Sequence, residues 1–309
     1  MKKFEDVFYE YFKFHSPSIS WGRQKEMVDQ YENHIHFFIG DLLLSEIDHH
    51  IVLQPIRKLE IEGKTRSSNQ VRQMIGRIFD YGFYCGYCHH NPIEVVRKAS
   101  KRHAANHFAF VQSCHFHYLY KEVRQLNILD LCHNIAFLII ILTASRTKEV
   151  CGMMWRELDF KSKIWFIPPH RMKTRIAHEV MLSEQVIDLL QKWKEVCSSE
   201  EYVFPSRYKC RDYITGYSIR RAILKTSFKY SQSLHGFRHL FSTTCYESGK
   251  WRDDPIELCI AHKPLSVTYS NSKRFYNHAK YREEKRLIMQ WYADKVEEWI
   301  LNEPFEEVN

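Results

Sequence analysis

The sequence lacks any apolar run that is long enough to cross a membrane. Its longest run, IAFLIIIL at 135–142, has eight residues, whereas a membrane-spanning helix needs about 20. The first residues, MKKFEDVFYEYF, interrupt each apolar stretch with charges, so no secretory signal is visible. We therefore interpret residues 135–142 as part of a buried core helix and expect no membrane partner.

The sequence also lacks a disulfide framework and a complete zinc motif. Its nine cysteines are scattered, which is typical of reduced thiols in a cytoplasm. One cluster, CGYCHH at 85–90, has Cys-x-x-Cys spacing with two histidines, but no second Cys-x-x-Cys accompanies it. We interpret this cluster as a helix end that runs into Asn91-Pro92, and we expect no metal ion.

What the sequence has is an uneven excess of positive charge. The chain has 309 residues, a net charge of +8 and a pI of about 8.9. Residues 55–103 contain ten basic residues against four acidic ones, which is most of the excess. This distribution predicts an anionic partner that binds near the N-terminal third. The basic residues expected to contact phosphates are Arg57, Lys58, Lys64, Arg66, Arg72, Arg77, Lys101 and Arg102.

The periodicity predicts two domains in a mostly α protein with a small β-sheet. Residues 1–103 form a helical domain, residues 104–309 form a second domain, and residues 96–107 link them. In the second domain, IWFI at 164–167 and HEVML at 178–182 predict a strand, a turn and a returning strand. The predicted helices cover 21–38, 45–58, 66–88, 115–142 with a break, 183–197, 216–229, 233–248 and 279–301.

The stretch SLHGFRHLF at 233–241 places two polar groups near the start of a predicted helix. Ser233 precedes the apolar periodicity and Gly249 follows it, as in a helix with caps at both ends. His235 and Arg238 are three residues apart and therefore share a face. A proton-transfer group beside a permanent cation suits an oxyanion or a phosphate. An ordinary polar surface face is the alternative.

Four other segments supply side chains that complete a chemical set. Arg146 follows the buried run, Lys173 lies in the hairpin turn, His262 follows an apolar helix, and Tyr276 precedes the last helix. Arginines bind phosphate oxygens in bidentate fashion and offset the charge of a pentacoordinate transition state. Histidine can assist a tyrosine nucleophile and lysine can protonate a leaving alkoxide. The set favours phosphoryl transfer by a tyrosine, with no need for a metal.

The sequence resembles the tyrosine recombinases, in particular the integrases of phages and genomic islands. TASRTKEV at 143–150 is similar to their T-G-x-R-x-x-E motif, and IWFIPPHRMKTRIAHEVMLS at 164–183 is similar to their hairpin. LHGFRHLFSTTCYESG at 234–249 and IELCIAHKP at 256–264 resemble the H-G-x-R and L-A-H-K motifs. YNHAKYREEKRLIMQWYADKV at 276–296 resembles the nucleophile segment with its terminal helix, and RIFDYGFYCGYCHHNPIE at 77–94 resembles the end of a core-binding domain. The resemblance covers nearly the whole chain.

The resemblance implies a SAM-like core-binding domain, a catalytic domain and a role for each site residue. It implies that Arg146 and Arg238 bind the scissile phosphate, that His262 hydrogen-bonds it, and that Glu149 supports the site. It further implies that Lys173 is the general acid, His235 assists proton transfer, and Tyr276 forms a 3′-phosphotyrosine link. No cofactor is expected, since the link conserves the energy of the broken bond.

Three assignments have competitors within the sequence. Tyr276 lies fourteen residues after His262, against about ten in the family, and Tyr269 lies only seven after it; the flanking YNHAKY favours Tyr276. Lys173 competes with Arg171 and Arg175 in the same hairpin. His178 and His239 we interpret as structural. The family often carries a further N-terminal arm-binding domain, and the sequence resembles the family from the core-binding domain onward.

The predicted function is therefore site-specific DNA recombination that integrates or excises a mobile element. Its expected partners are double-stranded attachment sites, three further copies in a synaptic tetramer, and DNA-bending or excision-directing accessory proteins. The expected location is the bacterial host cytoplasm, at the nucleoid. The alternative functions are DNA binding without strand exchange, on the same scaffold, and a monomeric topoisomerase.

Overall fold

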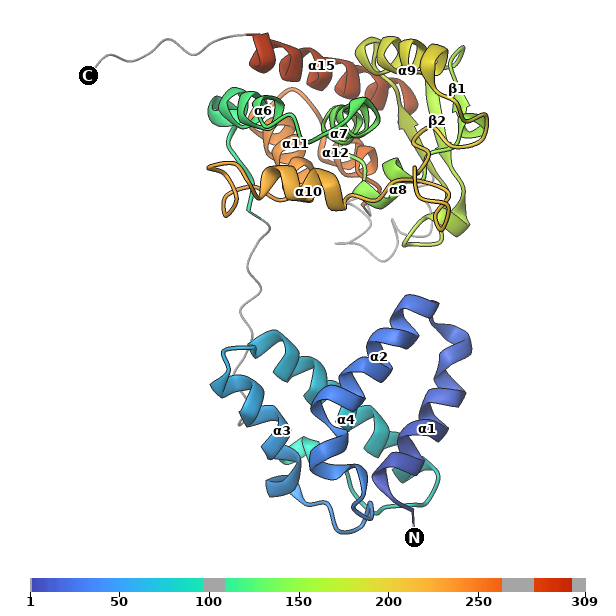
Figure 1. The fold of residues 1–309 in the computed structure, drawn as a ribbon, viewed down its shortest axis with the longest axis vertical. Helices are drawn as coiled ribbons and strands as arrows, with labels where there is room; N and C mark the ends of the chain where they lie inside the picture. The colour runs from blue at the N-terminus through green and yellow to red at the C-terminus, as the bar shows by residue number, and fades with distance from the viewer. Residues whose placement is uncertain (1, 97–108, 263–280, 302–309) are drawn as a thin grey trace, which may run out of the picture. The chain divides into compact units, whose positions relative to one another are not determined.

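The computed structural model describes residues 2–96, 109–262 and 281–301. The chain divides into two compact units, Met1–Asn106 and His107–Asn309 (Figure 1), and each has its own buried apolar core. No helix in these described ranges is long and apolar enough to cross a membrane.

The N-terminal unit is helical, and the long helix α4 contributes the largest share of its core. Val71, Ile75, Ile78 and Phe79 form one buried stripe on α4, as the 3.6-residue period predicts. The helices α1 and α3 pack against this helix. The bounds are α1 Phe4–His15, α2 Trp21–His34, α3 His49–Ile61, α4 Thr65–Tyr84 and α5 Ile93–Val96 (Figure 1).

The three helices predicted in this unit are present, but their ends differ from the prediction. The helix predicted at 66–88 ends at Tyr84, because Gly86 has a φ of 76°, a left-handed conformation in which an α-helix cannot continue. The helix predicted at 45–58 begins only at His49, because the Asp48 carboxylate accepts the N–H groups of His50 and Ile51. The segment predicted at 21–38 leaves the α-helix after His34 and makes a π-helical turn at His36–Gly40.

The C-terminal unit is built around α7, Leu131–Thr143, which contains the apolar run of the sequence. Residues 135–143 of this helix are buried except for Leu138. The helices α8, α9, α10, α11 and α15 all contact α7, so the prediction of a buried core helix is confirmed. The other bounds are α6 Phe116–Gln125, α8 Thr147–Cys151, α9 Glu184–Val196, α10 Tyr217–Ile223, α11 Gly236–Glu247, α12 Asp253–Cys259 and α15 Arg282–Leu301 (Figure 1).

A small antiparallel sheet in the order β1-β2-β3 lies in the same unit. The strands are β1 Leu158–Asp159, β2 Ile164–Ile167 and β3 His178–Met181. Trp165 pairs with Val180, and both side chains are buried, whereas Phe166 on the opposite face is exposed. This alternation is why the hairpin could be predicted from sequence. The predicted fold class, mostly α with a small sheet, is confirmed.

Two helix predictions in this unit were too long. The helix predicted at 216–229 is α10, which ends at Ile223, because Lys225 and Thr226 donate to carbonyls three residues back and tighten the chain into turns. The helix predicted at 233–248 is α11, which begins at Gly236 after a turn in which the Ser233 hydroxyl accepts the Gly236 N–H at 3.0 Å. Its predicted stop is confirmed, since Gly249 has a φ of 63°.

Candidate active site

Arg146 lies at the corner between the buried helix α7 and the short helix α8. Ala144 makes this corner with a φ of 47°, a left-handed conformation that costs an alanine about 1–2 kcal/mol. The Arg146 guanidinium pairs with the Glu149 carboxylate at 2.8 Å, and the same carboxylate accepts the Arg146 backbone N–H at 3.0 Å. Because Glu149 is only 4% exposed, this pairing fixes both the backbone and the side chain of Arg146.

Arg238 reaches the same corner from α11 and is almost completely buried. Its Nη1 donates to the Ala144 carbonyl at 2.6 Å, and its Nη2 donates to the Ile260 carbonyl. Burial, reinforced by the positive charge of Arg146, lowers the pKa of Arg238 to about 10. Two arginines within electrostatic reach repel each other, and an anion placed between them would attract both and offset that repulsion.

His262 follows α12 and completes a chain of hydrogen bonds to Arg238. Its Nδ1 lies 2.9 Å from the Glu257 carboxylate, and its Nε2 lies 3.4 Å from the Arg238 Nη2. Since a guanidinium can only donate, Nε2 accepts in this arrangement and Nδ1–H donates to Glu257. Glu257 also accepts the Tyr246 hydroxyl at 3.0 Å. Burial opposes ionisation of this carboxyl, but these two hydrogen bonds outweigh it and lower the pKa of Glu257.

His235 is the residue at the N-cap of α11, and it lies within electrostatic reach of the other groups. Burial is the main cause that lowers its pKa to about 4, and the charges of Arg238, His239, Arg146 and His262 add to it. The imidazole of His235 is therefore neutral at physiological pH and able to accept a proton.

The hairpin turn holds three cations, and the structure separates their surroundings. Arg171 is turned inward, where it pairs with the buried Glu157 carboxylate and donates to the Glu149 carbonyl at 2.5 Å. Lys173 and Arg175 are exposed on the connection between β2 and β3. Arg171 is thus committed to internal contacts, and Lys173 remains a cation that a ligand can reach.

His178 on β3 has the structural surroundings that we expected for it. The side chain is 8% exposed, and its Nε2–H donates to the Cys259 carbonyl at 3.2 Å, which joins β3 to the end of α12. Burial lowers the pKa of His178 to about 3. His239, the other histidine that we interpreted as structural, packs its ring against the His235 ring with centroids 5.6 Å apart.

Sequence reasoning missed Glu257, the acidic partner of His262. The available signal was a carboxylate in the helical turn that precedes the histidine. The Glu257 backbone carbonyl also accepts the His262 N–H at 2.9 Å, next to a left-handed Ala261 with a φ of 51°. This reversal of the chain brings His262 back over Glu257, and a periodic pattern does not reveal it.

The other predicted residues are either outside the described residues or belong to the N-terminal unit. Tyr276, its competitor Tyr269, and the linker residues Lys101 and Arg102 are outside the described residues. In the N-terminal unit, Arg57 and Lys58 are exposed on α3, Lys64 is exposed just before α4, and Arg66 and Arg77 are exposed on α4. Arg72 on α4 is partly buried and donates to the Asn69 side chain at 3.2 Å.

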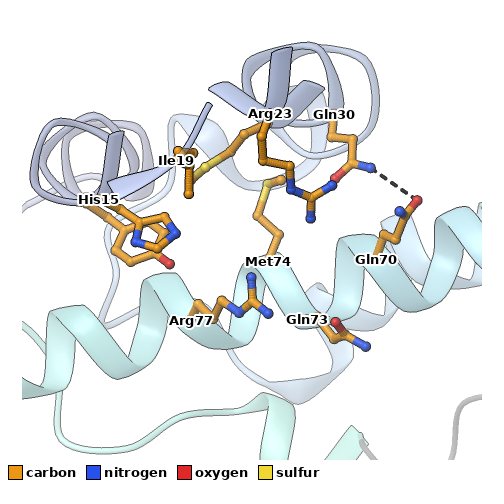
Figure 2. Close-up of a pocket in the computed structure, with 10 residues that line it drawn as sticks. His15, Ile19, Arg23, Gln30, Gln70, Gln73, Met74 and Arg77 are labelled. Carbon is orange, nitrogen blue, oxygen red and sulfur yellow. Dashed lines mark hydrogen bonds between the residues drawn. The ribbon is translucent and has the colours of Figure 1, made fainter. Parts of the chain in front are cut away.

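A polar pocket of about 40 Å³ opens among the helices of the N-terminal unit. Figure 2 shows Arg23 from α2 and Arg77 from α4 facing the same space, near a hydrogen bond of 3.2 Å from Gln30 to Gln70. None of the clustered residues of the C-terminal unit lines this pocket. Arg77 therefore shares this pocket with other side chains that can donate hydrogen bonds.

The described ranges contain no group of three or more His, Cys, Asp or Glu residues that could hold a metal ion. The Cys-x-x-Cys cluster at 85–90 follows the end of α4 at Tyr84, with Cys85 exposed and Cys88 buried.

Comparison with known proteins assigns both units to one family. Residues 113–283 match the phage integrase family and residues 4–99 match the phage integrase central domain. The chain is 30% identical over 300 residues to the prophage integrase IntS of Escherichia coli (strain K12), covering 96% of this chain and 76% of that protein. The same values hold for the integrase of Shigella phage Sf6.

Among solved structures, the fold matches a lambda integrase fragment, residues 75–356, that was crystallised as a dimer on a core site. The TM-score is 0.70 at 16% identity, covering 86% of this chain and 97% of that fragment. A fragment of the Tn1549 transposon integrase in complex with DNA matches with the same TM-score of 0.70, at 12% identity, over 94% of this chain and all of that fragment. The chain belongs to the phage integrase family and is a tyrosine-type site-specific DNA recombinase.

Proposed function

We propose that the cluster around Arg146 and Arg238 binds the scissile phosphate and that Tyr276 attacks it. The observation that carries this proposal is the pair of arginines, each fixed by protein partners and each within electrostatic reach of the other. A phosphate between two guanidinium groups is stabilised most when it carries the extra charge of a pentacoordinate transition state. Arg238 stays charged at neutral pH, because its pKa of about 10 leaves it protonated there.

In this proposal, side chains of this protein accept and supply every proton that moves in the cleavage step. The Tyr276 hydroxyl attacks the phosphorus, a bond forms between the phenolic oxygen and phosphorus, and the bond from phosphorus to the 5′ oxygen breaks. Neutral His235 receives the phenol proton, and Lys173 gives a proton to the departing 5′ oxygen. His262, which Glu257 holds through its Nδ1, forms a hydrogen bond with a phosphate oxygen. In the second step a 5′-hydroxyl from another strand attacks the phosphotyrosine and releases Tyr276.

The partner that we propose is double-stranded attachment-site DNA. The exposed cations of α3 and α4 would neutralise phosphates beside the cleavage site. Related integrases were solved as a dimer on a core site and as a tetramer on a Holliday junction. We extend this assembly to the present chain, with two copies on inverted half-sites and four in the synapse. The reaction would take place in the bacterial host cytoplasm, on integration or excision of a mobile element.

The test is covalent trapping on nicked duplexes that span the ends of the mobile element. Cleavage beside a nick releases a short strand, so the phosphotyrosine link cannot be reversed and the adduct accumulates. We expect the adduct with the unchanged chain and with Tyr269→Phe, and its loss with Tyr276→Phe. Loss in Tyr269→Phe with retention in Tyr276→Phe would overturn the nucleophile assignment. A full adduct yield from Arg146→Ala and Arg238→Ala would overturn the phosphate site.

A further inference from the structure

The segment from Ala109 to Val111 is packed against the beginning of α11, far from it in sequence. The Ala109 carbonyl accepts the Ser233 N–H at 3.1 Å, and it also accepts the Ser233 hydroxyl at 3.3 Å. The Val111 N–H donates to the buried Gln232 side chain at 2.8 Å. Because Gln232 and Ser233 lie three and two residues before His235, these hydrogen bonds fix the chain that leads into the catalytic cluster.

The contact between this segment and α11 is a close approach of backbone to backbone. A Cβ atom at Gly236 would lie 2.4 Å from the Ala109 carbonyl oxygen and 3.0 Å from the Phe110 Cβ. Neither neighbour is the mobile end of a flexible side chain, so any larger residue at 236 would push the segment away. The glycine beside His235 is therefore required by the packing of residues 109–111.

Aromatic rings continue this contact from the segment to His235. The Phe110 ring lies 5.9 Å from the His239 ring, centroid to centroid, with the two planes 25° apart. The His239 ring in turn meets the His235 ring at 5.6 Å and 74°, an edge-to-face contact. The two histidines are one helical turn apart on α11 and share a face. Three rings thus form a continuous row that ends at His235.

We propose that Phe110 is a positioning residue for His235 and acts through His239. The inference rests on the proposed function, in which His235 receives the phenol proton of the nucleophile. Residues 97–108 connect the N-terminal unit to this segment in the sequence. The segment is therefore the first described part of the C-terminal unit, and in our proposal it orients the proton acceptor of that unit.

In this proposal the row of rings also limits the access of water to His235. Among the described residues, the charged or titratable groups that act on His235 are Arg238 and His239 on α11, Arg146 at the start of α8, and His262 after α12. Arg146 and His262 come from elements that Phe110 does not contact in this row of rings. Loss of the Phe110 ring would leave the effect of these positive charges on His235 in place but would reduce the burial of His235. The pKa of His235 would then rise from about 4 toward its ordinary value.

The test compares Phe110→Leu, which removes the ring, with Phe110→Tyr, which keeps it. The full chain is labelled at histidine, and the titration of the His235 ring is followed by NMR, with His235→Gln identifying the signal. We expect Phe110→Leu to raise the midpoint by about one pH unit and to slow adduct formation on the nicked duplex roughly tenfold. Phe110→Tyr should restore both values. The control is Tyr118→Leu, which removes another aromatic contact with a histidine, His117, in the same unit.

Each outcome decides between the positioning role and a purely structural one. An unchanged titration in Phe110→Leu, or a slower reaction that Phe110→Tyr does not restore, would overturn the inference. If Phe110→Leu does not fold, Gln232→Ala releases Val111 without removing a ring, and it must raise the same midpoint. Absence of an adduct from the unchanged chain would count against the proposed function, while the titration would still decide whether Phe110 orients His235.

Discussion

Arg238 shows how this protein holds a charge where burial opposes it. Its side chain is 4% exposed, and two backbone carbonyls, those of Ala144 and Ile260, accept its hydrogen bonds. The carbonyls come from two different segments that end at the same place, so a single guanidinium joins them. The residue that binds phosphate in our proposal is therefore also one that shapes the site. Its replacement alone cannot separate these two roles, and variants of its neighbours are more informative.

Glu257→Ala tests one such neighbour. His262 would lose the carboxylate that accepts from its Nδ1, and we expect adduct formation to fall roughly tenfold or more. Tyr246→Phe is the matched control, because it removes only the second hydrogen bond to the same carboxylate. The measurement is the rate of covalent trapping at saturating DNA. Equal rates in Glu257→Ala and the unchanged chain would show that Glu257 does not orient His262.

His178 predicts a specific dependence of stability on pH. Its pKa is about 3 in the folded chain and about 6.5 when unfolded, so the unfolded state binds the proton first as pH falls. Stability is therefore full above about pH 6.5 and declines below it, by up to about 1.4 kcal/mol per pH unit. Denaturant unfolding from pH 7 to pH 4.5 should show a shallower decline for His178→Gln. A decline in His178→Gln as steep as that of the unchanged chain would contradict the account.

At the scale of elements, the hairpin is held by one buried ion pair. Arg171 pairs with Glu157, which also accepts the indole N–H of Trp165 at 3.0 Å. Glu157 is 8% exposed, and Trp165 is fully buried. The network joins the turn after β2 to the segment before β1 and to the Glu149 carbonyl of α8. It therefore fixes the base of the connection that carries Lys173.

Arg171→Ala should destabilise the chain by about 3 kcal/mol, because it leaves the Glu157 carboxylate buried and unpaired. Arg175→Ala in the same hairpin should change stability by less than about 0.5 kcal/mol, since Arg175 is exposed. Urea unfolding, with the slope checked for a change, measures both values. Equal effects of the two substitutions would show that the ion pair contributes no more than an exposed cation.

Sequence reasoning succeeded at this scale where local patterns determine the structure. The alternation of buried and exposed residues at 164–167 and 178–181 predicted the hairpin, and the run at 135–142 predicted the core helix before Arg146. It failed where tertiary contacts decide. No local pattern shows that Arg171 turns inward while Lys173 is exposed, because the ion pair with Glu157 decides this. In the same way, the left-handed turn at Ala261 sets Glu257 beside His262. Helix ends were misjudged for a similar reason, since the turns after Ile223 interrupt a helical composition.

At the scale of the whole molecule, residues 55–103 carry a local excess of positive charge, with ten basic residues against four acidic ones. Arg57 and Lys58 are neighbours on the exposed face of α3, and Lys58 lies 5.6 Å from the ring of Phe38. Each phosphate contact releases counterions, so affinity for DNA must fall as the salt concentration rises. A contribution from these two cations would appear in the steepness of that fall, independent of sequence-specific contacts.

Arg57→Gln with Lys58→Gln should reduce the slope of log affinity against log salt by about 1 to 2. Lys192→Gln provides the control, because Lys192 is an exposed lysine on α9 that already pairs with Asp188 at 2.7 Å. Fluorescence anisotropy on duplex DNA across a salt series gives the slopes. The same slope for the double variant and the unchanged chain would exclude α3 from the phosphate contacts.

The central claim is that the arginine pair presents a phosphate to Tyr276, and mapping the trapped adduct tests it most directly. Trypsin cuts after Arg274 and Lys280, so Tyr276 lies in the peptide FYNHAK, whereas Tyr269 lies in a separate peptide that ends at Lys273. Nuclease digestion of the adduct leaves a nucleotide on the linked residue, which mass spectrometry can locate. We predict the added mass on FYNHAK, and its appearance on the peptide with Tyr269, or on any other residue, would contradict the account.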